Sequence, residues 1–216
     1  MRIDDEMYNE IFNEDEHSKK DVQKIAINNN AVSLNLYDWV NSIIVAVVAV
    51  VILLTFCFRL IDVDGRSMEP TLINTDKVIV TNLFYTPNNG DVVVISHGEK
   101  YDKPLIKRVI ATEGQTLDID FENYKIYVDG VLIDEPYIQG ETIEGNADIP
   151  DVVPEGKVFV LGDNRPVSLD SRSREVGLID EESIIGKAQF VIIPHSYREG
   201  SLKPYLDLSK IRYIYE

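Results

Sequence analysis

The chain has 216 residues, 44% of them hydrophobic and 27% charged, and its 37 acidic and 21 basic side chains give a formal net charge of −16. These values indicate a folded chain of one or two domains, and the acidic balance excludes a broad nucleic-acid-binding face, which needs clustered Lys and Arg. The single cysteine excludes an internal disulfide framework and a Cys-rich metal site, and three scattered histidines leave little material for a His-based one.

The first 38 residues are polar and acidic. They contain nine acidic and four basic side chains, with a run of asparagines at Asn28–Asn30. Such a segment lacks the apolar surface that a folded core requires. We therefore predict an acidic, mobile tail over residues 1–38.

The tail is followed by an uncharged apolar run, Val40–Phe58, of 19 residues. As a helix this run would be about 28 Å long, close to the thickness of the hydrocarbon core of a bilayer. Tyr37 and Trp39 stand at one end and Arg59 at the other, as interfacial anchors do. The run predicts a transmembrane helix over residues 39–59, with a buried core helix as the weaker alternative.

A cleavable signal peptide is another interpretation of this run. Signal peptides begin with a short basic segment and end at a small-residue cleavage site. Here the preceding segment is long and acidic, and the following residues, FRLIDVDGRS, offer no suitably spaced pair of small residues. An uncleaved anchor is therefore favoured. The flanking bases do not orient it, because Lys20 and Lys24 precede the run while Arg59 and Arg66 follow it.

Residues 60–216 contain short runs rich in β-branched residues and bounded by Gly, Pro, Asn or Asp. The runs predict strands at Lys77–Thr81, Asp91–Ser96, Leu105–Ala111, Thr116–Asp120, Lys125–Val128, Val131–Ile133, Lys157–Leu161 and Gly186–Ile193. Between two of them, Asp129-Gly130 is a strong hairpin signal. We predict an all-β domain, built of antiparallel sheets or a barrel, with a smaller inserted β-lobe at about 113–155.

Two polar positions in this domain are candidates for chemistry. Ser67 follows Gly65, which permits unusual backbone angles, so a rigid bend can present the serine hydroxyl. Lys107 lies on a predicted strand, where the apolar residues two positions away on either side share its face. Desolvation there would lower the lysine pKa and suit the amine to act as a general base. Taken alone, each has an ordinary explanation, a surface turn and an edge-strand lysine.

A third cluster is the sequence GDNRPVSLDSR, which begins at position 162. Its hydrogen-bonding side chains are denser than a plain surface loop requires. Asp163 with Arg165, or Asp170 with Arg172, could brace the loop, and Ser168 could hydrogen-bond locally. A self-capped loop of Asx-type turns is the structural alternative.

Together these motifs resemble those of the bacterial type I signal peptidases, membrane-anchored serine proteases with a Ser/Lys dyad. They follow the order of that family: the apolar anchor, Ser67–Leu72 (SMEPTL), Gly90–Val94 (GDVVV), Lys107–Ile110 (KRVI) and Gly162–Arg172. The match covers the whole chain after the acidic tail. Five motifs in this order make the resemblance highly specific.

The resemblance implies that Ser67 is the nucleophile and that Lys107 is the general base. Ser168 matches a serine that hydrogen-bonds the lysine and orients it, and Asp170 and Arg172 match residues that support the site. A lysine at position 107 indicates the bacterial type, since the relatives of the endoplasmic reticulum carry histidine there. Neither a cofactor nor a metal is implied.

Gly65 departs from the pattern of some family members, which have a serine two positions before the nucleophile. That serine hydroxyl helps to hold the oxyanion, whereas many Gram-positive-type members have glycine, as here. The resemblance therefore implies the Ser67 backbone N–H as one oxyanion donor and a backbone group or a water as the second. The residues after the lysine motif, ATEGQ, are a minor further departure.

The family cleaves secretory preproteins after small residues, typically Ala-x-Ala, at the outer surface of the membrane. For this chain the resemblance implies secretory preproteins, the lipid bilayer and the secretion machinery as partners, and no nucleic acid. It also implies a single-pass protein of the bacterial cell membrane. The tail (1–38) would be cytoplasmic, the transmembrane helix would follow (39–59), and the peptidase domain (60–216) would be extracytoplasmic.

Three other functions compete with this one. A self-cleaving repressor also uses a Ser/Lys dyad, but it carries a DNA-binding helix-turn-helix and no anchor. A specialised signal peptidase for pilin or a few exported substrates stays open. A non-catalytic, membrane-tethered β-module that binds signal sequences is disfavoured by the intact Ser67 and Lys107.

Overall fold

The computed structural model describes residues 37–53, 55, 57–96, 103–198 and 200–214. The predicted acidic tail lies outside these residues except for its last two positions. The chain divides into two compact units, Met1–Leu54 and Thr55–Glu216, and each is described by itself.

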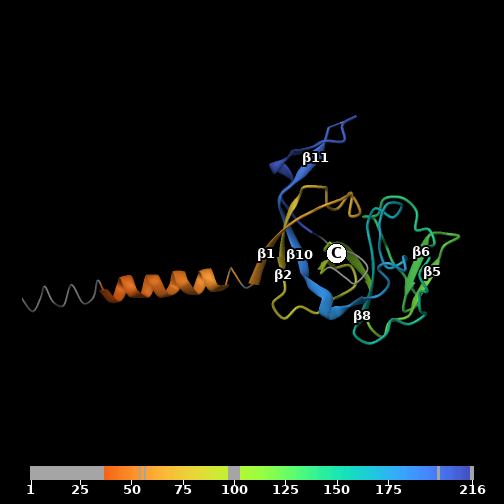
Figure 1. Ribbon diagram of the computed structural model, residues 1–216, viewed down its shortest axis with the longest axis horizontal. Helices are drawn as coiled ribbons and strands as arrows, with labels where there is room; N and C mark the ends of the chain where they lie inside the picture. The colour runs from red at the N-terminus through yellow and green to blue at the C-terminus, as the bar shows by residue number, and fades with distance from the viewer. Residues whose placement is uncertain (1–36, 54, 56, 97–102, 199, 215–216) are drawn as a thin grey trace, which may run out of the picture. The chain divides into compact units, whose positions relative to one another are not determined.

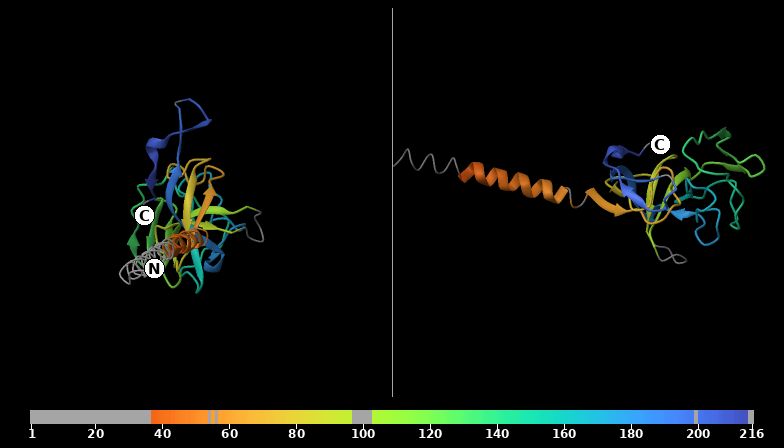
Figure 2. Two further views of the ribbon diagram at one scale, coloured as in Figure 1. Left: turned by 90° about the vertical axis from the view of Figure 1, so that its left-hand side faces the viewer. Right: turned by 90° about the horizontal axis from the view of Figure 1, so that it is seen from above.

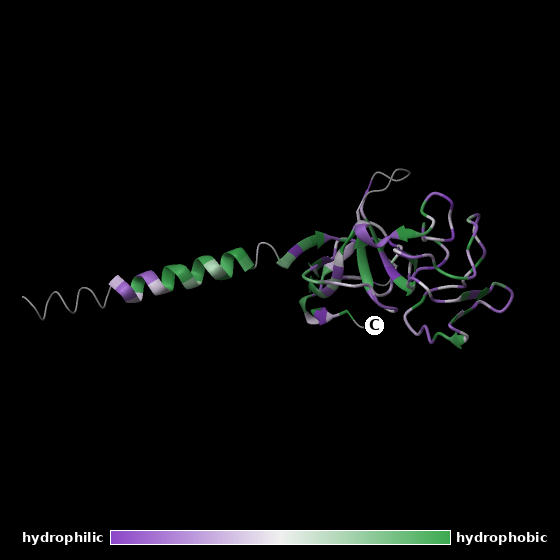
Figure 3. Ribbon diagram, turned by 90° about the horizontal axis from the view of Figure 1, so that it is seen from below, coloured by the Kyte–Doolittle hydropathy of each residue, from purple (hydrophilic) through white to green (hydrophobic). Residues whose placement is uncertain are grey.

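The described part of the first unit is a helix at residues 37–53. Near its start, the Ser42 hydroxyl donates to the Asp38 carbonyl at 2.8 Å. Apolar residues cover most of the helix beyond its first turns (Figure 3). Among the helices of the described residues, none has both the length and the apolarity needed to cross a membrane.

The second unit consists of short strands with two single-turn 3₁₀ helices. The elements are β1 Phe58–Asp62, β2 Lys77–Thr81, β3 Val92–Ile95, β4 Leu105–Ala111, β5 Leu117–Asp120, β6 Lys125–Val128, β7 Val131–Leu132, β8 Lys157–Leu161, β9 Ile179–Asp180, η1 Glu181–Ser183, β10 Ile184–Ile193, β11 His195–Tyr197, β12 Pro204–Leu206, η2 Leu208–Lys210 and β13 Arg212–Tyr213. The main sheet has the order β1-β2-β10-β3-β4-β8-β9, and β13 pairs with β10. Strands β11 and β12 form a two-stranded sheet, and β5, β6 and β7 form a third sheet.

The strands pair in an antiparallel manner, and the domain is mostly β, as the sequence predicts. The boundary at β1 differs from the prediction, because Phe58 and Arg59 belong to this strand and not to a helix. Phe58 pairs with Thr81 and Arg59 with Val80 of β2. Pairing with β2 satisfies the backbone groups of these residues and so ends the helical stretch before them.

The main sheet is curled, and β10 causes much of the curl. Its pairing with β2 shifts register between Ala188 and Phe190 and again between Val191 and Ile193, and bulges of this kind bend a strand and increase its twist. Gly186 lets β10 approach β2 closely, since a Cβ there would lie 2.4 Å from the Thr81 carbonyl oxygen. The curvature is visible in both views of Figure 2.

The three-stranded sheet β5-β6-β7 lies at the end of the second unit away from β1 (Figure 1). Its tight hairpin joins β6 to β7 through Asp129 and Gly130, with φ angles of 52° and 75°. Two positive φ angles are those of a type I′ turn, which matches the twist of the two strands. The predicted Asp129-Gly130 hairpin is thus confirmed.

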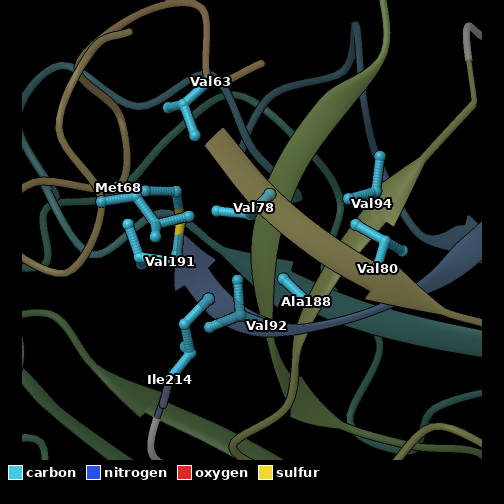
Figure 4. Close-up of a cluster of buried hydrophobic side chains, with 10 residues drawn as sticks. Val63, Met68, Val78, Val80, Val92, Val94, Ala188, Val191 and Ile214 are labelled. Atoms are coloured by element: carbon cyan, nitrogen blue, oxygen red, sulfur yellow. The ribbon is translucent and has the colours of Figure 1, made fainter. Parts of the chain in front are cut away.

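Three buried apolar clusters hold the second unit together. One joins the loop that follows β1 to β2, β3 and β10, and most of its members are labelled in Figure 4: Val63, Met68, Leu72, Val78, Val80, Val92, Val94, Ala188, Val191 and Ile214. Full burial of one such side chain contributes about 1.5–3 kcal/mol. The loop that follows β1 is therefore fixed by the same core as the sheet on which Lys107 lies.

Candidate active site

Ser67 lies in the loop that leaves β1. Gly65 takes a φ of 109°, which L side chains rarely adopt, and its N–H donates to Asn74 Oδ1 at 2.8 Å. Just after Ser67 the chain makes a turn in which the Leu72 N–H donates to the Met68 carbonyl at 2.8 Å. Met68 and Leu72 are 2% and 0% exposed, so both sides of the turn are held while Ser67 stays partly accessible.

Lys107 lies in the middle of β4 and is only 2% exposed. Its Nζ is 2.9 Å from Ser67 Oγ and 2.9 Å from the carbonyl oxygen of Ile106. Burial lowers the pKa of Lys107 to about 8, against the opposing attraction of the Asp170 and Asp163 carboxylates. An amine with this pKa is partly neutral near neutral pH and can accept the proton of the serine hydroxyl.

The loop between β8 and β9 contacts the backbone at Ser67. The Asn164 N–H donates to the Ser67 carbonyl at 2.9 Å, and Asn164 Nδ2 donates to the Arg66 carbonyl at 3.1 Å. The approach is close at Gly162, where a Cβ would lie 2.5 Å from the Ser67 carbonyl oxygen. The loop motif that begins at position 162 therefore holds the loop that carries Ser67 in place.

A buried ion pair links the same loop to β4. Arg108 follows the predicted base, is 1% exposed, and donates from Nε and Nη2 to the two oxygens of Asp163 at 2.9 and 2.7 Å. The Thr71 hydroxyl also donates to Asp163, and the ring of Tyr137 packs 3.8 Å from the Arg108 guanidinium carbon. Three segments that are distant in sequence are thus joined at one carboxylate, on the face of β4 opposite to Lys107.

Asp170 and Arg172 form a second buried pair. Arg172 donates from Nε and Nη2 to Asp170 at 2.9 Å each, and the Gly162 N–H donates to Asp170 at 3.1 Å. Arg172 also donates to the carbonyls of Arg165 and Ile143. The sequence suggests two ion pairs, Asp163 with Arg165 and Asp170 with Arg172. The structure contains the pair of Asp170 and Arg172, whereas Arg165 is paired with Glu135 and not with Asp163.

Ser168 does not hydrogen-bond Lys107 in this structure. Its Oγ is buried and has no hydrogen-bond partner among the described residues. The Nζ of Lys107 is instead engaged by Ser67 and by the carbonyl of Ile106. Ser168 packs against Gly162, where a Cβ would come within 2.1 Å of the serine oxygen. The loop therefore brings Ser168 close to the Ser67 backbone without the predicted hydrogen bond to Lys107.

A pocket of about 270 Å³ lies beside the Ser67 and Lys107 side chains. Besides these two residues, its lining consists of Ile61, Asp62, Val63, Asp64, Gly65, Met68, Val94, Lys103, Pro104, Leu105, Ile106 and Ile185. The side chains come from the chain around β1, from the start of β4, and from single positions on β3 and β10. A largely apolar pocket of this size next to a serine hydroxyl suits short apolar side chains.

Lys107→Met should stabilise the fold while removing the amine. In the folded state the pKa of Lys107 is lowered, so between about pH 8 and pH 10.4 the unfolded chain binds more protons and stability rises with pH. Below about pH 8 the full penalty of burying the charge, about 3 kcal/mol, applies. We expect urea unfolding at pH 6.5 to show a gain of about 2 kcal/mol after the loss of the amine hydrogen bonds. The gain should vanish near pH 11, and a destabilised variant at pH 6.5 would contradict the burial argument.

The sequence does not predict the hydrogen bonds that join Arg108, Asp163 and Thr71. The only sequence signal for them is the alternation of side chains along β4, which puts Arg108 and Lys107 on opposite faces of one buried strand. A buried guanidinium needs a carboxylate partner, but the sequence does not say which aspartate supplies it. In the described residues, no group of His, Cys, Asp or Glu side chains is arranged to hold a metal ion.

Known proteins are similar to this chain over most of its length. A family model described as signal peptidase, peptidase S26, matches residues 36–193. Signal peptidase I of Bacillus licheniformis is 37% identical over 171 residues, which cover 74% of this chain and 90% of that protein. Signal peptidase IB of Staphylococcus aureus is 37% identical over 188 residues, covering 78% and 95%. The crystal structure of a signal peptidase I from Enterococcus faecalis V583 gives a TM-score of 0.42 at 27% identity, covering 49% of this chain and 98% of that one.

Proposed function

Because the chain belongs to the peptidase S26 family of signal peptidases and is a serine endopeptidase that removes signal peptides, we propose that Ser67 is its nucleophile and Lys107 its general base. The observation that carries the proposal is the 2.9 Å separation of Lys107 Nζ and Ser67 Oγ. The amine is buried and its pKa is lowered to about 8, which supports the role of a base.

In the proposed reaction, neutral Lys107 takes the hydroxyl proton as Ser67 Oγ attacks the carbonyl carbon of the scissile bond. The resulting ammonium is stabilised by the negative charges of Asp163 and Asp170, which act to raise the lysine pKa. Lys107 then protonates the leaving amine, and an acyl-enzyme forms at Ser67. Once the leaving peptide has departed, the neutral amine activates a water that hydrolyses the ester.

The oxyanion of the tetrahedral intermediate needs hydrogen-bond donors in place. The Ser67 backbone N–H is our first candidate. The Gly65 N–H is not the second donor, because it already donates to Asn74 Oδ1 at 2.8 Å. A water bound beside Gly65, where a Cβ would meet no atom within 4 Å, fits the space that a serine hydroxyl occupies in other family members.

The surrounding polar residues would hold this geometry. The ion pair of Asp170 and Arg172 stabilises the loop that contacts the Ser67 backbone, and Ser168 packs against Gly162 of the same loop. None of the three contacts Ser67 Oγ through a hydrogen bond in the described residues, so we assign them positioning and not catalytic roles.

The pH dependence of the reaction tests the role of Lys107. Activity requires the neutral amine, so kcat/KM should fall as pH falls through the lysine pKa of about 8. At pH 6 only about 1% of the amine is neutral, and the rate should be about a hundredfold below its alkaline plateau. Cleavage of a preprotein measured between pH 5 and pH 10 checks this, and a flat profile between pH 6 and pH 9 would contradict Lys107 as the base.

We further propose that residues 39–57, the part of the predicted span that precedes β1, anchor the chain in the bacterial cell membrane, with the acidic tail cytoplasmic and the peptidase domain, which begins with β1 at Phe58, extracytoplasmic. The apolar run Val40–Phe58 and the membership of the signal peptidase family support this arrangement. The lipid bilayer and the secretion machinery would then be partners, and the lobe at 113–155 would be an insertion in the peptidase domain.

The proposed anchor predicts how the protein is extracted from bacterial membranes. Because a spanning helix is removed by detergent and not by loss of ionic contacts, the full chain should stay in the membrane pellet after alkaline carbonate and enter the supernatant with detergent. Protease added to intact cells without a wall should degrade the peptidase domain and leave an epitope on the tail. Release by carbonate would contradict the anchor, and a protected peptidase domain would contradict the orientation.

A further inference from the structure

An exposed ion pair belongs to the lining of the pocket beside Ser67. Lys103 Nζ is 2.9 Å from Asp64 Oδ2, and both residues line the pocket. The two side chains are 79% and 75% exposed, whereas Val94 in the same lining is fully buried. The pair therefore belongs to the outer rim of the pocket and Val94 to its floor.

The curl of the sheet makes this contact possible. In the main sheet, β1 and β4 are separated by β2, β10 and β3. Asp64 nevertheless meets Lys103, although the first lies two residues after β1 and the second two residues before β4. The ion pair thus joins the segment that follows β1 to the segment that precedes β4, and both segments line the pocket.

The direction of each side chain in an extended peptide decides which substrate residue contacts Asp64 and Lys103. This step rests on the proposed function, in which a peptide with an Ala-x-Ala end is cleaved at Ser67. In an extended chain successive side chains point to opposite sides. If the two alanine side chains enter the apolar pocket, the side chain of the middle residue points out of it, towards the rim that carries Asp64 and Lys103.

We infer that Asp64 and Lys103 are specificity-determining residues that contact the middle residue of the Ala-x-Ala end and set which charges it can carry. As a pair they present no net charge, so acidic, neutral and basic residues are all accepted at this position. With one partner removed, the other presents an uncompensated charge to the substrate. Asp64 alone would favour a basic middle residue, and Lys103 alone would favour an acidic one.

A purely structural role for this pair is a poor explanation. Exposed ion pairs contribute little to stability. Among the described charged residues that line the pocket, Asp64 and Lys103 are two of the more exposed. The hydrogen bond to Asp64 raises the pKa of Lys103, so Lys103 stays charged at the alkaline pH at which Lys107 is neutral. The pair is therefore intact under the conditions in which the enzyme works best.

The test compares three peptides that differ only in Glu, Gln or Lys as the middle residue. They are cleaved by the full chain in detergent micelles as wild type, Asp64→Asn, Lys103→Gln and the double variant. Lys157→Gln and Asp180→Asn, which break an ion pair outside the pocket lining, are the matched controls. The readout is the ratio of kcat/KM for the Glu and Lys peptides, and the melting temperature of each variant is measured alongside.

Wild type and the double variant should cleave all three peptides within about threefold. Asp64→Asn should prefer the Glu peptide over the Lys peptide by about three- to tenfold, Lys103→Gln should show the reverse, and 0.5 M salt should reduce both preferences. Unchanged ratios in both single variants, or equal changes in the controls, would overturn the inference while cleavage of the Gln peptide upholds the proposed function. Failure of wild type to cleave any peptide would instead contradict the proposed function, and the inference with it.

Discussion

Ser67→Ala should abolish the cleavage of a preprotein, lowering kcat by a factor on the order of 10⁵. The substitution removes Ser67 Oγ, the attacking oxygen, which lies 2.9 Å from Lys107 Nζ. Lys107 then has no hydroxyl proton to accept. The Thr71 hydroxyl cannot take over, because it donates its proton to Asp163. The measurement is single-turnover cleavage with N-terminal sequencing of the product.

The fold should survive this substitution, since Ser67 is partly exposed and its backbone contacts are kept. We expect a melting temperature within about 2 °C of wild type. Ser209→Ala is the matched control, because among the described residues the hydroxyl of this serine hydrogen-bonds to Asp207 and to no other. The control should keep full activity, and Ser67→Ala retaining more than a tenth of the wild-type rate would contradict the assignment of the nucleophile.

Lys107→Arg should be almost as damaging as the loss of the nucleophile, with kcat lowered by a factor on the order of 10⁴. Arginine supplies a permanent positive charge, but its guanidinium is always protonated in proteins and cannot accept the serine proton. A loss of this size separates the need for a neutral base from the need for a positive charge next to Ser67 Oγ. Cleavage at pH 9, where wild type is near its plateau, is the measurement.

Lys157→Arg is the control for this exchange, since Lys157 lies on β8 and pairs with Asp180 on the surface. It should leave kcat unchanged. If Lys107→Arg were active, with a rate that still falls on acidification near pH 8, the titrating group would be another residue and the dyad would be wrong. The same result would leave the family membership untouched.

Much of the fold follows from local patterns. The strands Lys77–Thr81, Leu105–Ala111, Lys125–Val128 and Lys157–Leu161 have the predicted bounds, because each is a run of β-branched residues between strong turn signals. The Asp129-Gly130 hairpin was predictable for the same reason, since its two positive φ angles suit Asp and Gly. Local propensity and tertiary pairing agree in these segments.

Other elements depend on contacts that no local pattern records. Strand β1 begins inside the apolar run because β2 is available to pair with Phe58, and the sequence of that segment alone favours a helix. β9 and β13 are two residues long and form by pairing with β8 and β10. A strand of two residues has no periodicity that can be detected.

The candidate site shows the same division. Ser67 and Lys107 could be singled out because a bend and a buried strand make their chemistry unusual, and a family resemblance then linked them across 40 residues of sequence. The pairing of Arg108 with Asp163 could not be derived, since several aspartates compete for one guanidinium and only the folded loop decides. Ser168 lies in the expected loop, but the position of Lys107 Nζ depends on main-chain atoms such as the Ile106 carbonyl.

The central claim is that Ser67 attacks with the help of Lys107, and an acyl-enzyme is its most direct evidence. The full chain in detergent should be mixed with a peptide ester ending in Ala-x-Ala and quenched in acid, which protonates Lys107 and so stops deacylation. Mass spectrometry of the digested protein is predicted to place the acyl group on the fragment containing Ser67 and on no other, and to find none in Ser67→Ala. An acyl group on a different residue, in protein that still turns the substrate over, would contradict the account.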